Sequence, residues 1–246
     1  MDNSFIPYRL FSLGDAAITI DFGNCIDERI NKEVLARYRQ IFAEPFPGMT
    51  ELIPAYSSLT VCYDIATIKK NYNHNRSAFE IIKELLTVYM QKPVTYLAEE
   101  SKLIKIPVCY TPEFGSDLQQ LADTNHLSVE EVIQLHTTKE YRVYMMGFLP
   151  GFAYMGEVDE RIAIPRKPQP KNVVAGSVGI AGKQTGIYPL DSPGGWYIIG
   201  KTPVKTFNTG DTQPILIKAG DRIQFFQISR QEYNELNNNT GIRHGS

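Results

Sequence analysis

The 246-residue sequence has few cysteines and histidines, the residues that form disulfides and bind structural metal ions. Its three cysteines, Cys25, Cys62 and Cys109, are odd in number and far apart, which argues against a disulfide framework and for a reducing compartment. No pair among these cysteines and the four histidines has the spacing of a zinc site, so we expect no metal in this chain.

The sequence also lacks an excess of either charge and long apolar runs. The formal net charge is −2 with no block of like charges, which argues against a nucleic-acid or polyanion binder. No apolar run approaches the roughly 20 residues that a membrane helix needs, and the opening MDNS has no basic or apolar signal region. We therefore expect a cytoplasmic protein with no nucleic-acid partner and no membrane contact.

The first hundred residues predict a compact α+β unit. The expected elements are strands within 8–22, a helix capped by Asp27 to about residue 42, strands at 51–54 and 59–63, and a helix from Ser77 to about residue 91. This order predicts one sheet with both helices on one face. The segment 92–102, with a proline and a charged patch, is the candidate domain boundary.

The remainder predicts a helical hairpin followed by many short strands. Ser128 and Glu131 have the spacing of a capping box for the second helix. The expected strands are 103–108, 141–148, 173–180, 195–199, 215–217 and 223–228. Short strands in this number predict a barrel or a sandwich, and the polar segment 231–246 is expected to fray.

The stretch 141–202 is rich in glycine and proline and holds the only tryptophan, Trp196. Ser177, Gln184, Thr185 and Ser192 lie among its glycines, where a ligand can approach the backbone closely. The segment GSVGIAGKQ at 176–184 departs from a Walker loop in spacing and lacks the final Ser or Thr, so a tight hairpin is the better interpretation. A non-Walker nucleotide or anion site stays open.

Two further groups of residues have both a functional and a structural interpretation. Arg166 and Lys167, with Lys171 nearby, belong to a proline-rich loop that is either an anion-binding rim or a solvated surface loop. The aromatic and methionine side chains around it are either core or the wall of an apolar pocket: Phe148, Phe152, Tyr154, Met155 and Trp196.

Several sequence blocks together resemble one family. They are LGDAA at 13–17, IPAYSSL at 53–59, the block 141–152, AGSVGIAGKQTGIYP at 175–189 and SPGGW at 192–196. They are similar to the family of the 5-oxoprolinase B subunit and KipI, also described as allophanate hydrolase subunit 1 and as the C/D part of a carboxyltransferase domain. The resemblance implies an α+β chain with a ferredoxin-like domain at 1–98 and a cyclophilin-like β-barrel domain at 99–246.

The resemblance also implies an activity and partners. Members of the family work as the B subunit of a heteromeric hydrolase that opens 5-oxo-L-proline to L-glutamate with ATP. The expected partners are a sister subunit of the A/B type (the 5-oxoprolinase C subunit) and a LamB/YcsF-type A subunit, with a shared site, so this chain alone is expected to be inactive. The alternative is a KipI-like inhibitor of a sensor histidine kinase, with an exposed apolar patch at Phe148, Leu149 and Tyr154. A weaker alternative is part of a urea-type carboxyltransferase.

ATP-assisted opening of a lactam needs an anchor for the substrate carboxylate and donors near the developing charge. We expect Arg166 to bind the carboxylate or a phosphate. The expected catalytic residues are Gln184, Thr185 and Ser192, and the expected substrate-binding residues beside Arg166 are Ser177, Phe152, Tyr188, Gly194 and Gly195. Lys183 stands where the family usually has a small or apolar residue, and its charge would favour an anionic ligand.

Overall fold

The computed structural model describes residues 6–72, 75–94, 101–147, 149–210, 212 and 214–242. Contacts divide the chain into two compact units, Met1–Glu99 and Glu100–Ser246. The expected border between residues 98 and 99 lies outside the described residues.

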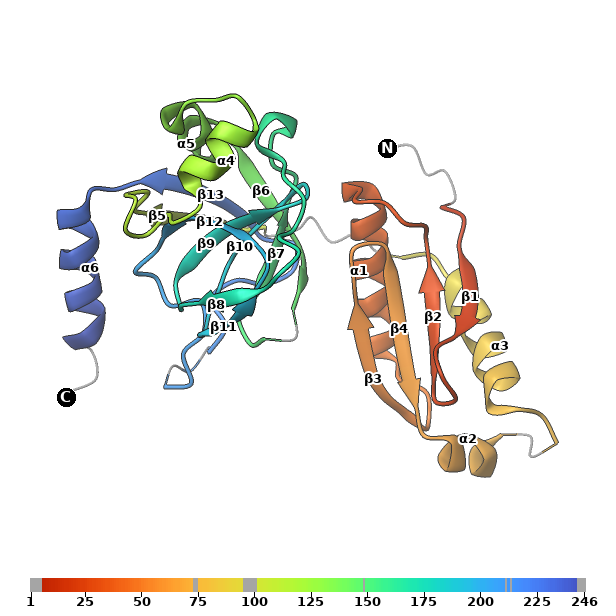
Figure 1. Cartoon of the computed structure of the whole chain (residues 1–246). Helices are drawn as coiled ribbons and strands as arrows, with labels where there is room; N and C mark the ends of the chain where they lie inside the picture. The colour runs from red at the N-terminus through yellow and green to blue at the C-terminus, as the bar shows by residue number, and fades with distance from the viewer. Residues whose placement is uncertain are drawn as a thin grey trace. The chain divides into compact units, whose positions relative to one another are not determined.

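The N-terminal unit is an antiparallel sheet backed by helices (Figure 1). Its strands β1 (Arg9–Ser12), β2 (Ala17–Asp21), β3 (Met49–Pro54) and β4 (Ser58–Tyr63) lie in the order β1-β2-β4-β3. Alternate strand residues such as Ile18, Ile20 and Val61 form one core with α1 (Glu28–Ala43) and α3 (Ala78–Gln91). Both helices therefore cover the same face, as the sequence predicts.

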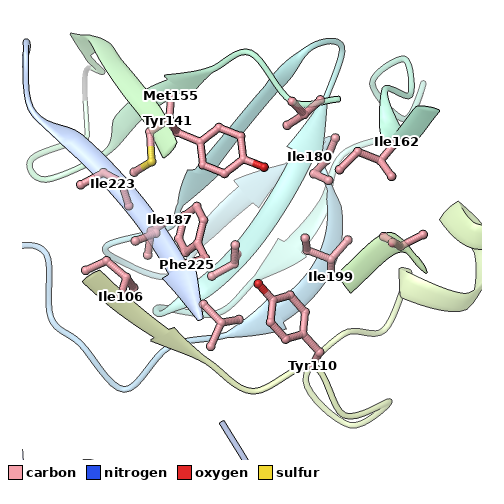
Figure 2. Close-up of a cluster of buried hydrophobic side chains, with 14 of the residues drawn as sticks. Ile106, Tyr110, Tyr141, Met155, Ile162, Ile180, Ile187, Ile199, Ile223 and Phe225 are labelled. Carbon is pink, nitrogen blue, oxygen red and sulfur yellow. The ribbon is translucent and has the colours of Figure 1, made fainter. Parts of the chain in front are cut away.

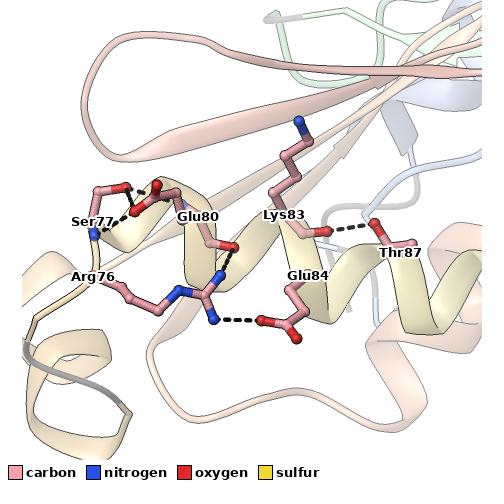
Figure 3. A network of polar contacts seen from close by, with 6 residues as sticks. All are labelled: Arg76, Ser77, Glu80, Lys83, Glu84 and Thr87. Atoms are coloured by element: carbon pink, nitrogen blue, oxygen red, sulfur yellow. Dashed lines mark hydrogen bonds and ion pairs between the residues drawn. The ribbon is translucent and has the colours of Figure 1, made fainter.

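The caps of the long helices agree with the sequence. The Asp27 carboxylate accepts a hydrogen bond from the Ile30 backbone at 2.9 Å. Ser77 and Glu80 form a reciprocal capping box, which Figure 3 shows at the start of α3. A short helix that was not predicted from the sequence, α2 (Ile65–Asn71), lies between β4 and α3 and is capped by Asp64. A capping residue and one apolar turn are a weak signal, because so short a helix depends on packing.

The C-terminal unit is built on a seven-stranded sheet that curls into a nearly closed barrel (Figure 1). The order is β12 (Tyr197–Lys201), β9 (Ser177–Ala181), β10 (Gln184–Ile187), β7 (Ala153–Gly156), β6 (Glu140–Met146), β13 (Arg222–Gln227) and β5 (Leu103–Val108). Cys109, just after β5, and Lys201 of β12 exchange two backbone hydrogen bonds of 2.9 and 3.0 Å. This bridge joins the two edges of the sheet.

Large apolar side chains fill the barrel, and Figure 2 shows Tyr141, Met155, Ile180 and Phe225 among them. Helices α4 (Leu118–Thr124) and α5 (Val129–Thr137) pack against this core through residues such as Leu121. The capping box of Ser128 and Glu131 begins α5, as predicted. A single turn of 3-10 helix (Glu160–Ile162) contacts α5. The chain is thus a mixed α+β protein with a nearly closed barrel sheet and separate smaller sheets.

Three expectations for this unit were wrong. The strand predicted at 173–180 is two strands, β8 (Lys171–Val173) and β9, separated by a turn at Gly176 with a φ of 82°. A β-carbon at Gly176 would lie 2.6 Å from the Thr202 carbonyl oxygen, so the turn requires glycine. The segment 215–217 is not a strand: Ile215 makes only an isolated bridge with Phe207.

The third difference is the helix α6 (Arg230–Ile242), which lies within the segment 231–246 that was expected to fray; residues 243–246 lie outside the described residues. Ser229 and Glu232 exchange capping hydrogen bonds of 2.7 and 3.2 Å, which begins the helix. The first turn is then held by packing, because the rings of Tyr233 and Phe114 lie 4.4 Å apart between centroids.

Candidate functional site

A second, smaller apolar cluster lies apart from the barrel core, and it contains much of the glycine- and proline-rich stretch. We call the four rings Phe152, Tyr154, Tyr188 and Trp196 the aromatic cluster. Phe152 meets Tyr188 and Trp196 edge-on at centroid distances of 5.2 and 5.5 Å, and Tyr154 lies 5.8 Å from Trp196. Edge-to-face contacts at these distances are favourable for aromatic rings. Val173 of β8 packs against the same cluster.

Strands β8 and β11 (Ser192–Gly194) form a separate two-stranded sheet at this site, and glycines fit it to the rings. A β-carbon at Gly194 would lie 2.3 Å from the Tyr188 hydroxyl, and one at Gly186 would lie 3.1 Å from the Trp196 ring. Only glycine allows backbone and ring to approach this closely. The glycine content read as site-like therefore has a direct packing role at these positions.

Arg166 brings the positive charge to the aromatic cluster. Its side chain is exposed, and its guanidinium carbon lies 5.9 Å from the centroid of the Trp196 ring. A guanidinium at this distance over an indole face makes a cation–π contact and keeps its hydrogen-bond donors for a ligand. In the part of the chain that the structure describes, Arg166 has no acidic partner.

Tyr188 supplies a neutral hydroxyl beneath that charge. Burial raises the pKa of Tyr188 to about 12, although the charge of Arg166 and a hydrogen bond from the Trp196 backbone act in the opposite direction. Desolvation is the larger effect because the ring is almost wholly buried. At neutral pH the site therefore combines a guanidinium, an uncharged phenol and apolar ring surfaces.

Lys167 and Lys183, which the sequence suggested could offer positive charge to an anion, are each paired with a carboxylate. Lys167 does not belong to an anion-binding rim: its ammonium turns inward and pairs with Asp117 at 2.5 Å. Lys183 pairs with Glu160 at 2.5 Å, which raises the pKa of the lysine and lowers the pKa of the carboxyl. The extra positive charge expected from Lys183 is thus balanced by a neighbouring carboxylate.

The predicted site residues fall into two groups. Phe152, Tyr188 and the backbone of Gly194 and Gly195 gather around Trp196 with Arg166. Ser192 begins β11 in the same small sheet, and its buried hydroxyl oxygen has no hydrogen-bond partner among the described residues. An unpaired buried hydroxyl is unusual and is available to a ligand atom.

Thr185, Gln184 and Ser177 belong to the barrel wall. The Thr185 hydroxyl donates to the Gly179 carbonyl at 3.0 Å and meets His136 Nε2 at 2.9 Å, deep in the unit. Gln184 is half-buried at the start of β10, and Ser177 is buried at the start of β9. Ser177 is adjacent to the cluster through its backbone, because its carbonyl accepts from the Tyr188 N–H at 2.9 Å.

Thr185 is part of a buried network that the sequence did not reveal. Since the Thr185 hydroxyl donates its one hydrogen to the Gly179 carbonyl, Thr185 Oγ1 accepts a hydrogen bond from Nε2–H of His136. Nδ1 of His136 then accepts a hydrogen bond from the Tyr110 hydroxyl at 2.7 Å. Burial lowers the pKa of His136 to about 3, so the ring is neutral. The three residues come from distant parts of the chain, so no local pattern could have indicated the network.

Within the described ranges, no group of three or more His, Cys, Asp or Glu side chains is arranged to hold a metal ion. No helix in that part of the chain is long and apolar enough to cross a membrane.

Comparison with known proteins places this fold and site in a family. Residues 8–217 match the model of the carboxyltransferase domain, subdomain C and D. The chain belongs to this family. The matched region includes the N-terminal sheet, the aromatic cluster and Arg166, and it ends before β13.

Two curated relatives are similar to this chain over nearly their whole length. The 5-oxoprolinase B subunit of Bacillus subtilis (strain 168) is 45% identical over 230 residues, which cover 93% of this chain and 96% of the relative. The 5-oxoprolinase B subunit of Escherichia coli O157:H7 is 34% identical over 218 residues, or 88% and 94% of the two chains. Both relatives are named as subunits of a 5-oxoprolinase.

A solved protein called TTHA0988 has the same fold, with a TM-score of 0.72 and 34% identity. The match covers 87% of this chain but 40% of that one, so this chain spans less than half of that protein.

Proposed function

We propose that this chain is the B subunit of a 5-oxoprolinase and that it contributes Arg166 and the aromatic cluster to the opening of 5-oxo-L-proline to L-glutamate. The observation that carries the proposal is the similarity to the B subunit of the Bacillus subtilis enzyme over 93% of this chain and 96% of the relative. Because the similarity covers both units, it concerns the whole polypeptide and not a shared module.

The geometry suits a small, flat, anionic substrate. 5-Oxoproline has a carboxylate on a five-membered lactam ring, and Arg166 offers guanidinium donors above the Trp196 ring. The apolar faces of Phe152 and Tyr154 are suited to the ring methylenes. The Tyr188 phenol is uncharged at neutral pH and the Ser192 hydroxyl is unpaired, so both can donate to the lactam oxygen.

Charge develops on that oxygen during the reaction, and a positioned donor stabilises it. Water alone opens an unstrained lactam poorly, so we propose that ATP bound in the assembled enzyme would phosphorylate the amide oxygen with release of ADP. Attack of water on the activated carbon would then open the ring with release of phosphate. Of the other expected catalytic residues, Gln184 remains a proposed contact to the amide. Thr185 would act indirectly, because its hydroxyl is already bonded to Gly179 and His136.

We further propose that the site is completed by the other subunits of the enzyme, a sister subunit of the A/B type and a LamB/YcsF-type subunit. On this proposal the N-terminal unit is ferredoxin-like, the barrel unit is cyclophilin-like and the complex works in the cytoplasm. The word subunit in the names of the relatives supports a heteromeric enzyme. The isolated chain is then expected to release no glutamate.

The test is a glutamate-release assay on the complex purified through a tagged chain, with ATP and 5-oxoproline. Arg166→Ala should lower kcat/KM by about a hundredfold, since a charged anchor for the carboxylate is lost. Arg161→Ala is the matched control, because Arg161 is exposed and its carboxylate partner is Asp159, two residues away in the same turn. Full activity of the Arg166 variant, or equal losses in both, would refute the assigned site.

The kinase-inhibitor alternative gains no specific support from the structure. Of its predicted apolar patch, Phe148 lies outside the described residues, and Leu149 and Tyr154 are half-buried against the aromatic cluster.

A further inference from the structure

The loop that carries Arg166 is bonded to the Trp196 segment at Lys167, the residue that follows Arg166. The Lys167 N–H donates to the Gly195 carbonyl at 2.8 Å, which joins the residue after Arg166 to the residue before Trp196. One hydrogen bond alone does not fix the spacing of the two segments, so a second contact is needed to hold them together.

Asp117 provides that second tie. One of its carboxylate oxygens, Oδ2, accepts from the Lys167 ammonium at 2.5 Å and from the Ile198 N–H at 2.7 Å. The Asp117 N–H in turn donates to the Ile198 carbonyl at 2.9 Å. Asp117 thus holds the backbone two residues after Trp196 and, through Lys167, the loop one residue after Arg166.

The ion pair is sheltered from water. The side chains of Lys167 and Asp117 are 11% and 9% exposed, and the Lys167 ammonium also lies 5.1 Å from the centroid of the Tyr197 ring. A sheltered pair of this kind is a poor source of net stability, because desolvating two charges offsets much of their attraction. The pair instead fixes the position of the loop, because the Lys167 ammonium and the Asp117 carboxylate must stay in contact.

We infer that Lys167 is a positioning residue, whose ion pair with Asp117 holds the loop so that Arg166 stands over Trp196 and meets the anionic group of the substrate. The activity part of this inference rests on the proposed function. The placement of Arg166 over Trp196 does not, and it can be measured without substrate.

The chain contains one tryptophan, so a 15N-labelled sample gives a single indole N–H signal that reports on Trp196. Arg166→Ala defines how that signal moves when the guanidinium is removed. Lys167→Met should move the signal in the same direction. Because this variant leaves Asp117 buried and unpaired, the folding control is the double variant Lys167→Met with Asp117→Asn. That variant removes both charges and keeps an amide oxygen for the Ile198 N–H.

In the complex, Lys167→Met should raise the KM for 5-oxoproline roughly tenfold, as expected for a displaced anchor. In the Arg166→Ala background the same change should have no further effect, because its effect acts through Arg166. Lys92→Met is the control: it breaks an exposed pair with Glu44 in the other unit and should change neither readout.

An indole signal that stays in place in the folded double variant would overturn the inference, as would additive effects of the Lys167 and Arg166 variants on KM. If Arg166→Ala leaves activity unchanged, the proposed substrate site fails, and the indole measurement alone then decides the role of Lys167.

Discussion

The buried His136 ring makes the stability of the C-terminal unit sensitive to mild acid. Its neighbours are Tyr110, Thr185 and the rings of Tyr141 and Phe225, whose centroids lie 5.4 and 4.6 Å from that of His136. None of these is a carboxylate that could accept the charge of a protonated ring. Burial therefore lowers the pKa of His136 from 6.5 to about 3.

The direction of this pH dependence follows from the uptake of a proton by His136. Below pH 6.5 the unfolded chain binds a proton on His136, whereas the folded chain does not until about pH 3. Acid therefore favours unfolding between pH 6.5 and about pH 3. The contribution of the neutral His136 to stability is fully present above pH 6.5. At about 1.4 kcal/mol per pH unit, the loss of unfolding free energy at pH 5 is about 2 kcal/mol. The whole difference between the unfolded and folded pKa of His136 limits this loss to about 5 kcal/mol at lower pH.

The assay is urea unfolding at pH 8, 6 and 5, followed by the fluorescence of Trp196, which reports on the C-terminal unit alone. His136→Gln removes the titrating group and keeps polar atoms near Tyr110 and Thr185. The variant should be less stable at pH 8, but its stability should fall by about 2 kcal/mol less than that of the unaltered chain between pH 8 and pH 5. Parallel pH curves for the two proteins would contradict the reasoning, because carboxylates elsewhere contribute equally to both.

Three further predictions concern single contacts. Arg37→Met should lower the stability of the N-terminal unit by about 3 kcal/mol in urea unfolding followed by circular dichroism, because the buried ion pair with Glu33 and the guanidinium hydrogen bonds to the Tyr89 and Lys92 carbonyls are lost together; a change below about 1 kcal/mol would show that water reaches the pair. Gly194→Ala should displace the Tyr188 ring and shift the Trp196 emission, since the new methyl group would lie 2.3 Å from the Tyr188 hydroxyl. An unchanged emission spectrum would mean that the backbone of β11 moves and the Tyr188 ring stays in place. Ser128→Ala should cost about 1 kcal/mol through the lost cap of α5, measured by thermal unfolding, and an unchanged midpoint would mean that packing alone sets that helix start.

The sequence predicted those parts of the fold whose cause is local. Asp27, Ser77 and Ser128 each cap a helix within three residues, so their chemistry can be read from adjacent positions. The helix α6 was missed although Ser229 and Glu232 have the same spacing. The polar composition after residue 231 was given more weight than the cap, and the packing of Tyr233 on Phe114 was not visible.

The candidate site was predictable in composition but not in connectivity. The glycine- and proline-rich stretch 141–202 that the sequence singled out contains both Arg166 and Trp196, and in the structure the Arg166 guanidinium carbon lies 5.9 Å from the centroid of the Trp196 ring. The opposite orientations of Arg166 and Lys167 could not be predicted, because the partner that turns Lys167 inward is Asp117, fifty residues earlier. The burial of Thr185 depends on His136 of another element in the same way.

The barrel closure has a consequence for biosynthesis. The first strand of the C-terminal unit, β5, pairs in parallel with its last strand, β13, from Leu103 with Arg222 to Val108 with Gln227. During translation, β5 leaves the ribosome more than one hundred residues before its neighbour, and until then its edge is open. The N-terminal unit has all four strands by residue 63 and can fold meanwhile. A nascent chain that stalls before residue 222 therefore exposes an unpaired strand edge. Such an edge can bind a chaperone or pair with another chain and aggregate.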